Sequence, residues 1–315
     1  MKIFTVIVTY NGAAWIGGAL QSLRESHHPC TAVVVDNASS DDTCAIVRRD
    51  FPEATLVETG ANLGFGRGNN LGIELALRAG ADAVLLLNQD AWVTPDALGQ
   101  LVGFLQQEPG FDIVSPLHCS PDLTRVDPNT QSAYLQRYAP AYLSDACLGR
   151  VQPHYPLRGI NAAAWLLRAG VFRRVGGFDP LFFMYGEDDD LIERFAHHGV
   201  RTALVPAARI VHLRAKAPQP PQTWAQRWRG RSERLRSALL LELKRPGGSL
   251  PGQLLRWLST GMLRPLSDLL LNHDGQLFLA HLRASVRVLG EFGRIRRHAR
   301  LCAAPGAHFL NLDRP

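Results

Sequence analysis

The chain has 315 residues, of which 46% are apolar and 20% charged, proportions that exclude a disordered or collagen-like protein. Lys and Arg number 34 against 28 Asp and Glu, and the net charge of +6 favours an anionic partner without naming one. This length fits one large domain with a smaller region attached.

The five cysteines are widely spaced and form no C-x-x-C pair. This usage favours a reducing cytoplasm over a disulfide framework or a zinc site. The first ten residues hold a short apolar run without a cleavage site, so we expect a buried strand there rather than a signal peptide. A stretch of about 18 uncharged apolar residues does not occur, and a membrane-spanning helix is not expected.

Four short apolar runs lie at 3–9, 32–35, 54–57 and 83–87. Continuous runs of this length predict strands that are buried on both faces of a parallel sheet. Helical patterns lie between them, at 15–23, 42–49 and 70–79. The alternation of strand and helix predicts a doubly wound α/β sandwich.

The second part of this domain is less regular. A helix is predicted from Pro95 to Phe104 and a strand at 113–114. The stretch 116–156 is rich in proline, lacks periodicity and is expected to form loops around the site. Regular patterns then recur until about residue 215, at 162–167, 169–175, 181–185, 187–198 and 202–205.

Residues 216–222, with three prolines, predict a stiff linker between a catalytic domain (1–215) and a basic, mainly helical region (223–315). Charge changes sign there: residues 1–215 hold 17 Lys or Arg against 22 Asp or Glu, whereas 216–300 hold 16 against 5. Apolar residues in this region recur every three or four positions, at Leu254, Leu258, Met262, Leu266, Leu270, Phe278, Leu282, Val286 and Leu289.

Polar segments follow each of the first four strands, at the sheet edge where α/β proteins bind ligands. They contain Thr9-Tyr10-Asn11, residues 36–41, residues 62–70, and Asn88-Gln89-Asp90. Together they carry more polar side chains than turns require. The glycines near Phe65 fit G-x-G-x-x-G in neither register and follow the third strand, which argues against a dinucleotide fingerprint.

Two acidic groups are candidates for chemistry. Asp90 ends a buried strand, and oxygen ligands there suit Mg²⁺ or Mn²⁺ bound together with substrate phosphates, although a capped strand end is the simpler interpretation. The four carboxylates from Glu187 to Asp190 exceed what a helix N-terminus needs, and aromatic residues precede them, so a functional cluster is favoured. His212 is either a further ligand or a structural histidine.

With these residues assembled, the chain resembles the family 2 glycosyltransferases, and within them the rhamnosyltransferase-like bacterial group. The resemblance covers roughly residues 3 to 215 and rests on five motifs in order, at 6–11, 34–41, 62–72, 87–90 and 176–188. It implies a GT-A fold, a nucleotide-sugar-binding α/β sandwich. It also implies that a sugar is transferred from a nucleoside-diphosphate donor to a hydroxyl, with inversion of the anomeric centre. One such donor is dTDP-rhamnose, which supplies L-rhamnose.

The resemblance also implies roles for single residues. Asp188 would be the catalytic base and Glu187 a second catalytic residue, and Asp90 and His212 would hold Mg²⁺ or Mn²⁺. The nucleotide sugar would be bound by Thr9, Tyr10, Asn11, Asp36, Asn62, Gly64, Phe65, Asn70, Asn88 and Gln89. The chain departs from the general D-x-D pattern at Asn88, so Asp90 would be the only carboxylate of that motif on the metal.

Two other functions stay open at this point. A nucleotidyltransferase shares the sandwich and the metal but usually has a basic, glycine-rich phosphate loop after the first strand, where this chain has Thr9 to Ala14. A non-catalytic protein that binds a nucleotide sugar or a glycan is the second alternative.

The expected partners are a dTDP- or UDP-linked donor and a glycan or polyprenyl-linked acceptor, in cytoplasmic biosynthesis of cell-surface polysaccharide. For residues 223–300 three interpretations remain: peripheral contact with anionic lipid at the inner face of the plasma membrane, contact with a partner, or packing on the catalytic domain. Nucleic acid is not expected, because the arginines are interleaved with apolar stripes and no nucleic-acid-binding motif occurs.

Overall fold

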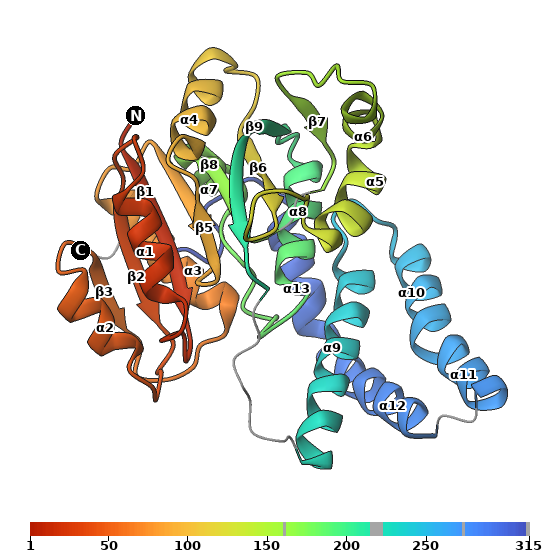
Figure 1. Ribbon diagram of the computed structural model, residues 1–315. Coiled ribbons are helices and arrows are strands. Elements are labelled where there is room, and N and C mark those ends of the chain that lie inside the picture. Colours follow the sequence, from red (N-terminus) through yellow and green to blue (C-terminus); the bar gives the residue numbers. More distant parts are fainter. Residues whose placement is uncertain (160–161, 215–222, 273–274, 313–315) are drawn as a thin grey trace.

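The computed structural model describes residues 1–159, 162–214, 223–272 and 275–312, so the predicted linker at 216–222 lies outside the described residues. Figure 1 shows a central sheet with helices on both faces and a group of C-terminal helices beside it. The sheet order is β3-β2-β1-β4-β8-β6-β9-β5, with β7 beside β9. The strands are β1 (Ile3–Thr9), β2 (Thr31–Asp36), β3 (Thr55–Glu58), β4 (Ala83–Leu87), β5 (Ala91–Val93), β6 (Ile113–Cys119), β7 (Tyr155–Leu157), β8 (Ala164–Arg168) and β9 (Thr202–His212).

The first four strands form the parallel half of the sheet. Thr9 lies opposite Asp36 and Asp36 opposite Glu58, so the polar segments after β1, β2 and β3 leave the sheet at one edge. The prediction of four parallel strands is confirmed. Beyond β4 the sheet is mixed, because β8 pairs antiparallel with both β4 and β6.

Helices cover both faces of the sheet through two apolar clusters. One cluster joins the sheet to α1 (Ile16–Arg24), α2 (Thr43–Asp50) and α4 (Ala97–Gln107). The other joins it to α3 (Phe65–Arg78), α7 (Ala169–Val175) and α8 (Glu187–His197). The prediction of burial on both faces holds for β1, β4 and most of β2, because helices cover their apolar side chains on each side. It is wrong for β3, which is an edge strand and is only partly buried.

Helix α3 begins at Phe65, earlier than the predicted Asn70. Gly64, at a φ of 82°, turns the chain into the helix, and glycine adopts this φ without strain. Gly72 lets the helix approach β1 closely, because a Cβ there would lie 2.3 Å from Cγ1 of Val6. The glycines that looked like a loop therefore belong to a tightly packed helix.

The stretch 116–156 is not the continuous loop that the sequence predicted. It continues β6 to Cys119 and then forms η1 (Thr130–Leu135), α5 (Gln136–Tyr138), α6 (Pro140–Cys147) and β7. These elements are too short to produce a readable period. The expected regular element at 181–185 is also absent, because Tyr185 and Gly186 have φ values of 69° and 87° and turn the chain there.

The C-terminal helices are α9 (Trp224–Lys244), α10 (Leu250–Leu258), η2 (Ser259–Leu263), α11 (Arg264–Asn272), α12 (Gly275–Gly290) and α13 (Phe292–Ala303). Their apolar cluster includes Leu181 and Phe182 of the α/β domain. The chain then returns to the sheet side, where Gly177 donates a 2.8 Å hydrogen bond to the His308 carbonyl (Figure 1). In the part of the chain that the structure describes, none of the helices is both long and apolar enough to cross a bilayer.

Candidate functional site

A cavity of about 200 Å³ opens at the carboxyl ends of β1 and β4. It is lined by Val8, Thr9, Tyr10, Asn37, Asn62, Phe65, Asn88, Gln89, Asp90 and Met184. A larger cavity, of about 480 Å³, lies near the amino end of β2 and the C-terminal end of α1, where its one carboxylate, Glu53, pairs with Arg24. The smaller cavity is the candidate site, because it gathers polar side chains from four strand ends.

Gln89 joins the ends of β1 and β4. Its Oε1 accepts a 2.6 Å hydrogen bond from the Thr9 hydroxyl and a 3.1 Å bond from the Tyr10 N–H. Thr9 is buried, whereas the Tyr10 ring is half exposed at the rim of the cavity. The predicted residues Thr9, Tyr10 and Gln89 thus lie together, and Gln89 fixes the wall of the cavity from within.

Asp36 and Asn11 shape the loops beside the cavity rather than line it. Asp36 is buried and accepts hydrogen bonds from the N–H, at 2.9 Å, and the hydroxyl of Ser39. The Asn11 Oδ1 accepts a 2.8 Å bond from the Ser40 N–H, which ties the loop after β1 to the loop after β2. Asn37, which was not singled out beforehand, is the member of this segment that lines the cavity.

Asn62 and Phe65 line the cavity from the loop before α3. Gly64, between them, lies against the backbone of Phe183, where a Cβ would be 2.2 Å from the carbonyl oxygen. This contact brings the loop before α8 against the loop before α3. Met184 of the same loop then lines the cavity with Asp90; it belongs to the motif at 176–188, but no role was predicted for it.

Three side chains at the end of β4 and β9 have spare polar atoms. The Asp90 carboxylate lies 3.6 Å from Nε2 of His212, because Ala91 pairs with His212 in the ladder of β5 and β9. Among the described residues, the buried Oδ1 of Asn88 and Nδ1 of His212 have no hydrogen-bond partner. His118 packs on His212 with ring centroids 6.0 Å apart, and burial and His212 lower its pKa to about 3.

This donor set fits a hard divalent cation in part. A carboxylate and an amide oxygen are ligands of the kind that Mg²⁺ and Mn²⁺ prefer. Within the described residues, His, Cys, Asp and Glu side chains do not gather in groups of three or more with metal-binding geometry. A cation here would therefore take its remaining ligands from water and from phosphate oxygens of a bound substrate.

The acidic cluster forms the first turn of α8, with Gly186 before it in the left-handed region. Burial and the charge of Asp188 raise the pKa of Glu187 to about 7. Burial and the charge of Asp189 raise the pKa of Asp188 to about 6. Asp188 is half-buried, so a carboxylate with a raised pKa meets solvent at the start of α8, four residues after the cavity residue Met184, and this is a suitable state for a general base.

Two residues of η1 and α5, Tyr134 and Arg137, interact electrostatically with this cluster. Burial and the charges of Asp188 and Asp189 raise the pKa of Tyr134 to about 12. Burial also raises the pKa of Asp189, and the charge of Arg137 opposes that rise. Tyr134 and Arg137 belong to the stretch that was expected to be loop. They are neighbours of the acidic cluster that sequence analysis did not single out, and a short segment without periodicity offered no signal for them.

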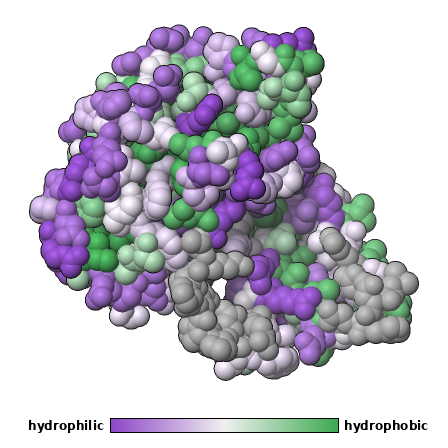
Figure 2. Space-filling view, viewed as in Figure 1, coloured by the Kyte–Doolittle hydropathy of each residue, from purple (hydrophilic) through white to green (hydrophobic). Residues whose placement is uncertain are grey.

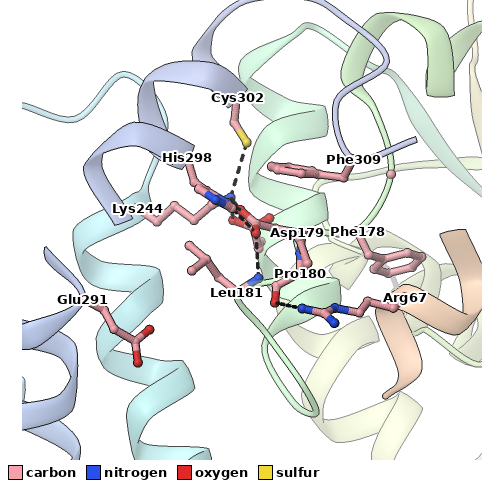
Figure 3. Close-up of polar contacts among 12 residues, drawn as sticks. Arg67, Phe178, Asp179, Pro180, Leu181, Lys244, Glu291, His298, Cys302 and Phe309 are labelled. Carbon is pink, nitrogen blue, oxygen red and sulfur yellow. Dashed lines mark hydrogen bonds and ion pairs between the residues drawn. The ribbon is translucent and has the colours of Figure 1, made fainter. Parts of the chain in front are cut away.

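The fourth carboxylate of the cluster, Asp190, has a structural role. It is buried and bound by Arg194 at 2.9 Å and by Nζ of Lys244, a residue of α9. The Nζ of Lys244 also lies 2.9 Å from the carboxylate of Asp179. That carboxylate lies 2.8 Å from Nδ1 of His298 on α13 (Figure 3). The loop from Asp179 to Asp190 is thus fixed by charges from the C-terminal helices.

Burial favours the neutral forms of Asp179 and Lys244, yet their neighbours keep both groups charged. Burial alone would raise the pKa of Asp179, but His298 and Lys244 lower it to about 2. Burial would lower the pKa of Lys244, but Asp190 and Asp179 raise it. Asp179, Asp190, Lys244 and Arg194 form a balanced set of two anions and two cations, which is what makes their burial tolerable.

Asn70 is the predicted binding residue that lies away from the cavity. Its Nδ2 donates to the carbonyls of Phe178, at 2.8 Å, and Phe309, at 3.2 Å, and its Oδ1 accepts a 2.7 Å bond from the Phe178 N–H. Asn70 therefore joins α3 to the loop before α8 and to the C-terminal segment.

Comparison with known proteins agrees with this geometry. A family model described as "Glycosyl transferase family 2" matches residues 5–167, and one described as "N-terminal domain of galactosyltransferase" matches residues 146–216. The chain is 29% identical over 235 residues to the N-acetylglucosaminyl-diphospho-decaprenol L-rhamnosyltransferase of Mycobacterium tuberculosis, covering 67% of this chain and 75% of that protein. It is 23% identical over 212 residues to the dTDP-rhamnosyl transferase RfbF of Shigella flexneri, covering 67% and 69%.

Two solved structures share the fold. Residues 1–349 of TarS from S. aureus, in complex with UDP-GlcNAc, match with a TM-score of 0.58 at 16% identity, over 96% of this chain and 88% of that one. The mannosyltransferase PcManGT from Pyrobaculum calidifontis, in complex with GDP-Man and Mn²⁺, matches with a TM-score of 0.56 at 21% identity, over 96% and 84%. The fold is therefore of the GT-A type, an α/β sandwich followed by helices.

Proposed function

The chain belongs to glycosyl transferase family 2, and from this premise we propose that it transfers L-rhamnose from dTDP-rhamnose to a hydroxyl of a polyprenyl-diphosphate-linked glycan, inverting the anomeric centre. One observation carries the proposal beyond the family. A single cavity is lined by Asp90 from the end of β4 and by Met184 from the loop that leads to Asp188. We propose that the diphosphate binds at Asp90 and that the acceptor approaches this space from the side of the loop that carries Met184 and Asp188.

The donor side is the edge of the parallel strands. We assign the nucleoside to the wall formed by Thr9, Tyr10, Asn37 and Gln89, and the sugar to the space beside Asn62 and Phe65. Asp36 and Asn11 would act on the donor by holding the loops in place, and Asn70 would act through Phe178. The rhamnosyltransferase relatives support dTDP-rhamnose as the donor.

We propose that Asp90, Asn88 and His212 hold Mg²⁺ or Mn²⁺. The ion would supply Lewis-acid neutralisation of the charge that develops on the diphosphate leaving group. The partnerless atoms of Asn88 and His212 support this assignment. His118, which burial keeps neutral, adds no positive charge that would repel the ion.

Asp188 would act as the general base. As the acceptor oxygen forms a bond to C1 of the sugar, the bond from C1 to the phosphate oxygen breaks, and its electron pair leaves on the nucleoside diphosphate. The acceptor proton passes to the Asp188 carboxylate, help that is typically worth about 10² to 10⁴ in rate. Its pKa of about 6 leaves it ionised at neutral pH, while Glu187, with a pKa of about 7, takes a proton first.

A donor panel tests the proposal. Purified protein with Mg²⁺ or Mn²⁺ is given dTDP-rhamnose, UDP-hexoses or GDP-mannose and a short-chain polyprenyl-diphosphate N-acetylglucosamine, and NMR assigns the anomeric configuration of the product. We expect metal-dependent transfer from dTDP-rhamnose at least about tenfold above other donors. Preference for a UDP-hexose would refute the donor assignment, and a product that retains configuration would refute the mechanism.

The same assay separates the two alternatives that the sequence left open. A nucleotidyltransferase would consume sugar phosphate and release pyrophosphate, whereas transfer releases dTDP. A binding protein would retain the donor without turnover. The proposed place of action is the cytoplasmic side of a membrane, where a lipid-linked acceptor of this kind would present its sugar.

A further inference from the structure

The outward face of the helical run from α10 through η2 to α11 is made of large apolar side chains. Leu255, Leu263 and Leu270 are 68%, 59% and 65% exposed. Exposed apolar residues recur about every four positions, at Leu250, Leu254, Leu255, Leu258, Met262, Leu263, Leu266 and Leu270. The predicted apolar repeat is thus real, but it faces away from the protein.

The same helices pack on their neighbours through other residues. In α10 and η2, Gln253, Trp257 and Gly261 are buried. Gly261 approaches α12 closely, since its carbonyl accepts a 3.1 Å hydrogen bond from the Ser285 hydroxyl. The inward face is therefore satisfied, and the leucines on the opposite face are not needed to hold these helices together.

Helix α12 repeats the arrangement. Its inward face is built from the small or medium residues Ala280, Ala284 and Val288, which are fully buried. Its outward face carries Leu279, Leu282, Val286 and Leu289, all exposed. Small residues between helices and large apolar residues outside are the distribution expected where the surroundings are lipid rather than water. Figure 2 shows hydrophobic surface among polar residues over this part of the molecule.

The charges around these faces select the partner. Three carboxylates of the region pair with an arginine, in the pairs Glu233–Arg287, Glu242–Arg256 and Glu291–Arg236. Exposed arginines remain on α9 and α13, at Arg229, Arg234, Arg294, Arg297 and Arg300. A second copy would bring the same excess of positive charge to the interface, whereas an anionic bilayer complements it.

An aromatic and cationic group borders the apolar faces. Trp224 and Trp228 stack with ring centroids 6.1 Å apart, and the guanidinium of Arg283, on α12, lies 4.9 Å from the Trp228 ring. Trp224 is exposed. Tryptophan and arginine beside an apolar face are typical of protein segments that lie at the boundary between headgroups and acyl chains.

We propose that the outward faces of α10, η2, α11 and α12 form a membrane-docking surface that inserts leucine side chains into an anionic phospholipid bilayer, with the arginines of α9 and α13 at the headgroups. Hydrophobic insertion provides most of the binding, and charge selects anionic lipid. Figure 1 shows α10, α11 and α12 on the side of the molecule away from the parallel strands.

Helix α9 connects this surface to the candidate site. The guanidinium of its Arg234 lies 5.5 Å from the ring of Tyr185, which follows the cavity residue Met184. The loop side chains Phe183, Met184 and Tyr185 are exposed. A lipid-linked acceptor held by the same bilayer would therefore approach the site along this loop, a consequence that rests on the proposed function, whereas the docking surface itself does not.

The test is flotation of the full-length protein with vesicles of phosphatidylcholine, with or without phosphatidylglycerol. The variant Leu255→Ser/Leu263→Ser/Leu270→Ser removes apolar groups from the surface. The matched control, Leu123→Ser/Leu148→Ser/Val151→Ser, removes three exposed apolar groups from the α/β domain. We expect the first variant to lose at least about 100-fold in vesicle affinity and the control to bind like the wild type.

Both variants should hydrolyse or transfer soluble donor like the wild type, so loss of docking is distinguishable from failure of the proposed function. Wild-type protein that stays unbound at every lipid composition would overturn the proposal, as would equal binding by the two variants. A wild-type dimer that the first variant converts to a monomer, without vesicle binding, would assign the face to a second copy instead. Binding that vanishes at high salt in the wild type would contradict hydrophobic insertion as the main contribution.

Discussion

The C-terminal helices combine buried charges, set among an apolar inner cluster, with exposed leucines on their outer face. On the inner face Lys244 is 1% exposed and lies between Asp179 and Asp190, which are 0% and 3% exposed. On the outer face of α10 and α11, leucines lie in solvent. The buried charges bind the loop that carries Asp188. The exposed leucines are explained by the proposal that a lipid bilayer covers them.

This contrast shows that the helical region is more than an attachment. The segment from Asp179 to Asp190 carries Asp188, and its two ends are held by Lys244, Arg194 and His298. Truncation at the linker would leave Asp179 and Asp190 without Lys244. The two faces must therefore be tested by single substitutions in the full chain.

The largest effect is expected on the inner face. Lys244→Met leaves two buried carboxylates with less positive charge, and breaking a buried ion pair from one side typically costs about 3–5 kcal/mol. Thermal unfolding should shift down by roughly 10 °C, and transfer should fall with it. The matched control is Arg245→Met, the next residue, whose 2.7 Å pair with Glu193 is half exposed, so a change within about 1 kcal/mol is expected. Equal shifts in the two variants would contradict the contrast.

A smaller effect is expected from Asn70 of α3, which holds the same loop before α8 from the side of the sheet. Asn70→Ala removes three hydrogen bonds to buried backbone groups of Phe178 and Phe309. Loss of such partners costs about 1–3 kcal/mol, which calorimetry or denaturant unfolding can measure. If Asn70 instead contacts the donor, the variant should raise the donor KM and leave the unfolding temperature unchanged.

The pH profile separates the catalytic carboxylate from the structural ones. Because the pKa of Asp188 is raised to about 6, protonation below that pH should remove the base, and kcat should fall about tenfold per pH unit. Protonation of Asp188 and Glu187, whose pKa values are raised, favours the folded state. Asp179, with a pKa lowered to about 2, contributes stability that is present above its unfolded value of 3.8 and is lost as pH falls through about 2.

Activity should therefore disappear between about pH 7 and 5 while the unfolding temperature is unchanged or rises. Parallel titrations of initial rate and thermal unfolding check this. A loss of stability that accompanies the loss of activity in this range would show that the rate reports unfolding rather than the ionisation of Asp188.

The smallest effect is expected on the outer face. Leu263→Ser removes a side chain that contacts mostly solvent in the free protein, so the free energy of unfolding should change by less than about 0.5 kcal/mol. Denaturant titration without lipid measures it. A loss above about 2 kcal/mol would mean that the leucine is buried against protein in solution.

Much of the fold could be predicted, because its first half is written in short local patterns. The strands β1 to β4 and the polar segments after them follow from continuous apolar runs and their neighbours. The elements around Tyr134 could not be predicted, since η1 and α5 are too short to show a period. The position of β8, antiparallel to β4, depends on long-range pairing that no local pattern records.

The candidate site divides in the same way. Asp90, Asn88, Gln89 and Thr9 lie together because they end neighbouring strands. Asn70 looked like a donor ligand, and only the position of Phe178 shows what its amide binds. The sequence did not distinguish Lys244 from the many other cations of the basic region. Periodicity showed that α10 to α12 are amphipathic, but it did not show which face other helices cover.

The most direct test of the central claim compares Asp188→Asn with Asp189→Asn in transfer from dTDP-rhamnose to the soluble acceptor. Both variants remove one carboxylate from the first turn of α8 and keep its shape, but only Asp188 is assigned to take the acceptor proton. We predict that Asp188→Asn lowers kcat by at least about 10² at an unchanged unfolding temperature, while Asp189→Asn lowers it by less than about tenfold. Near-normal turnover by Asp188→Asn would contradict the account.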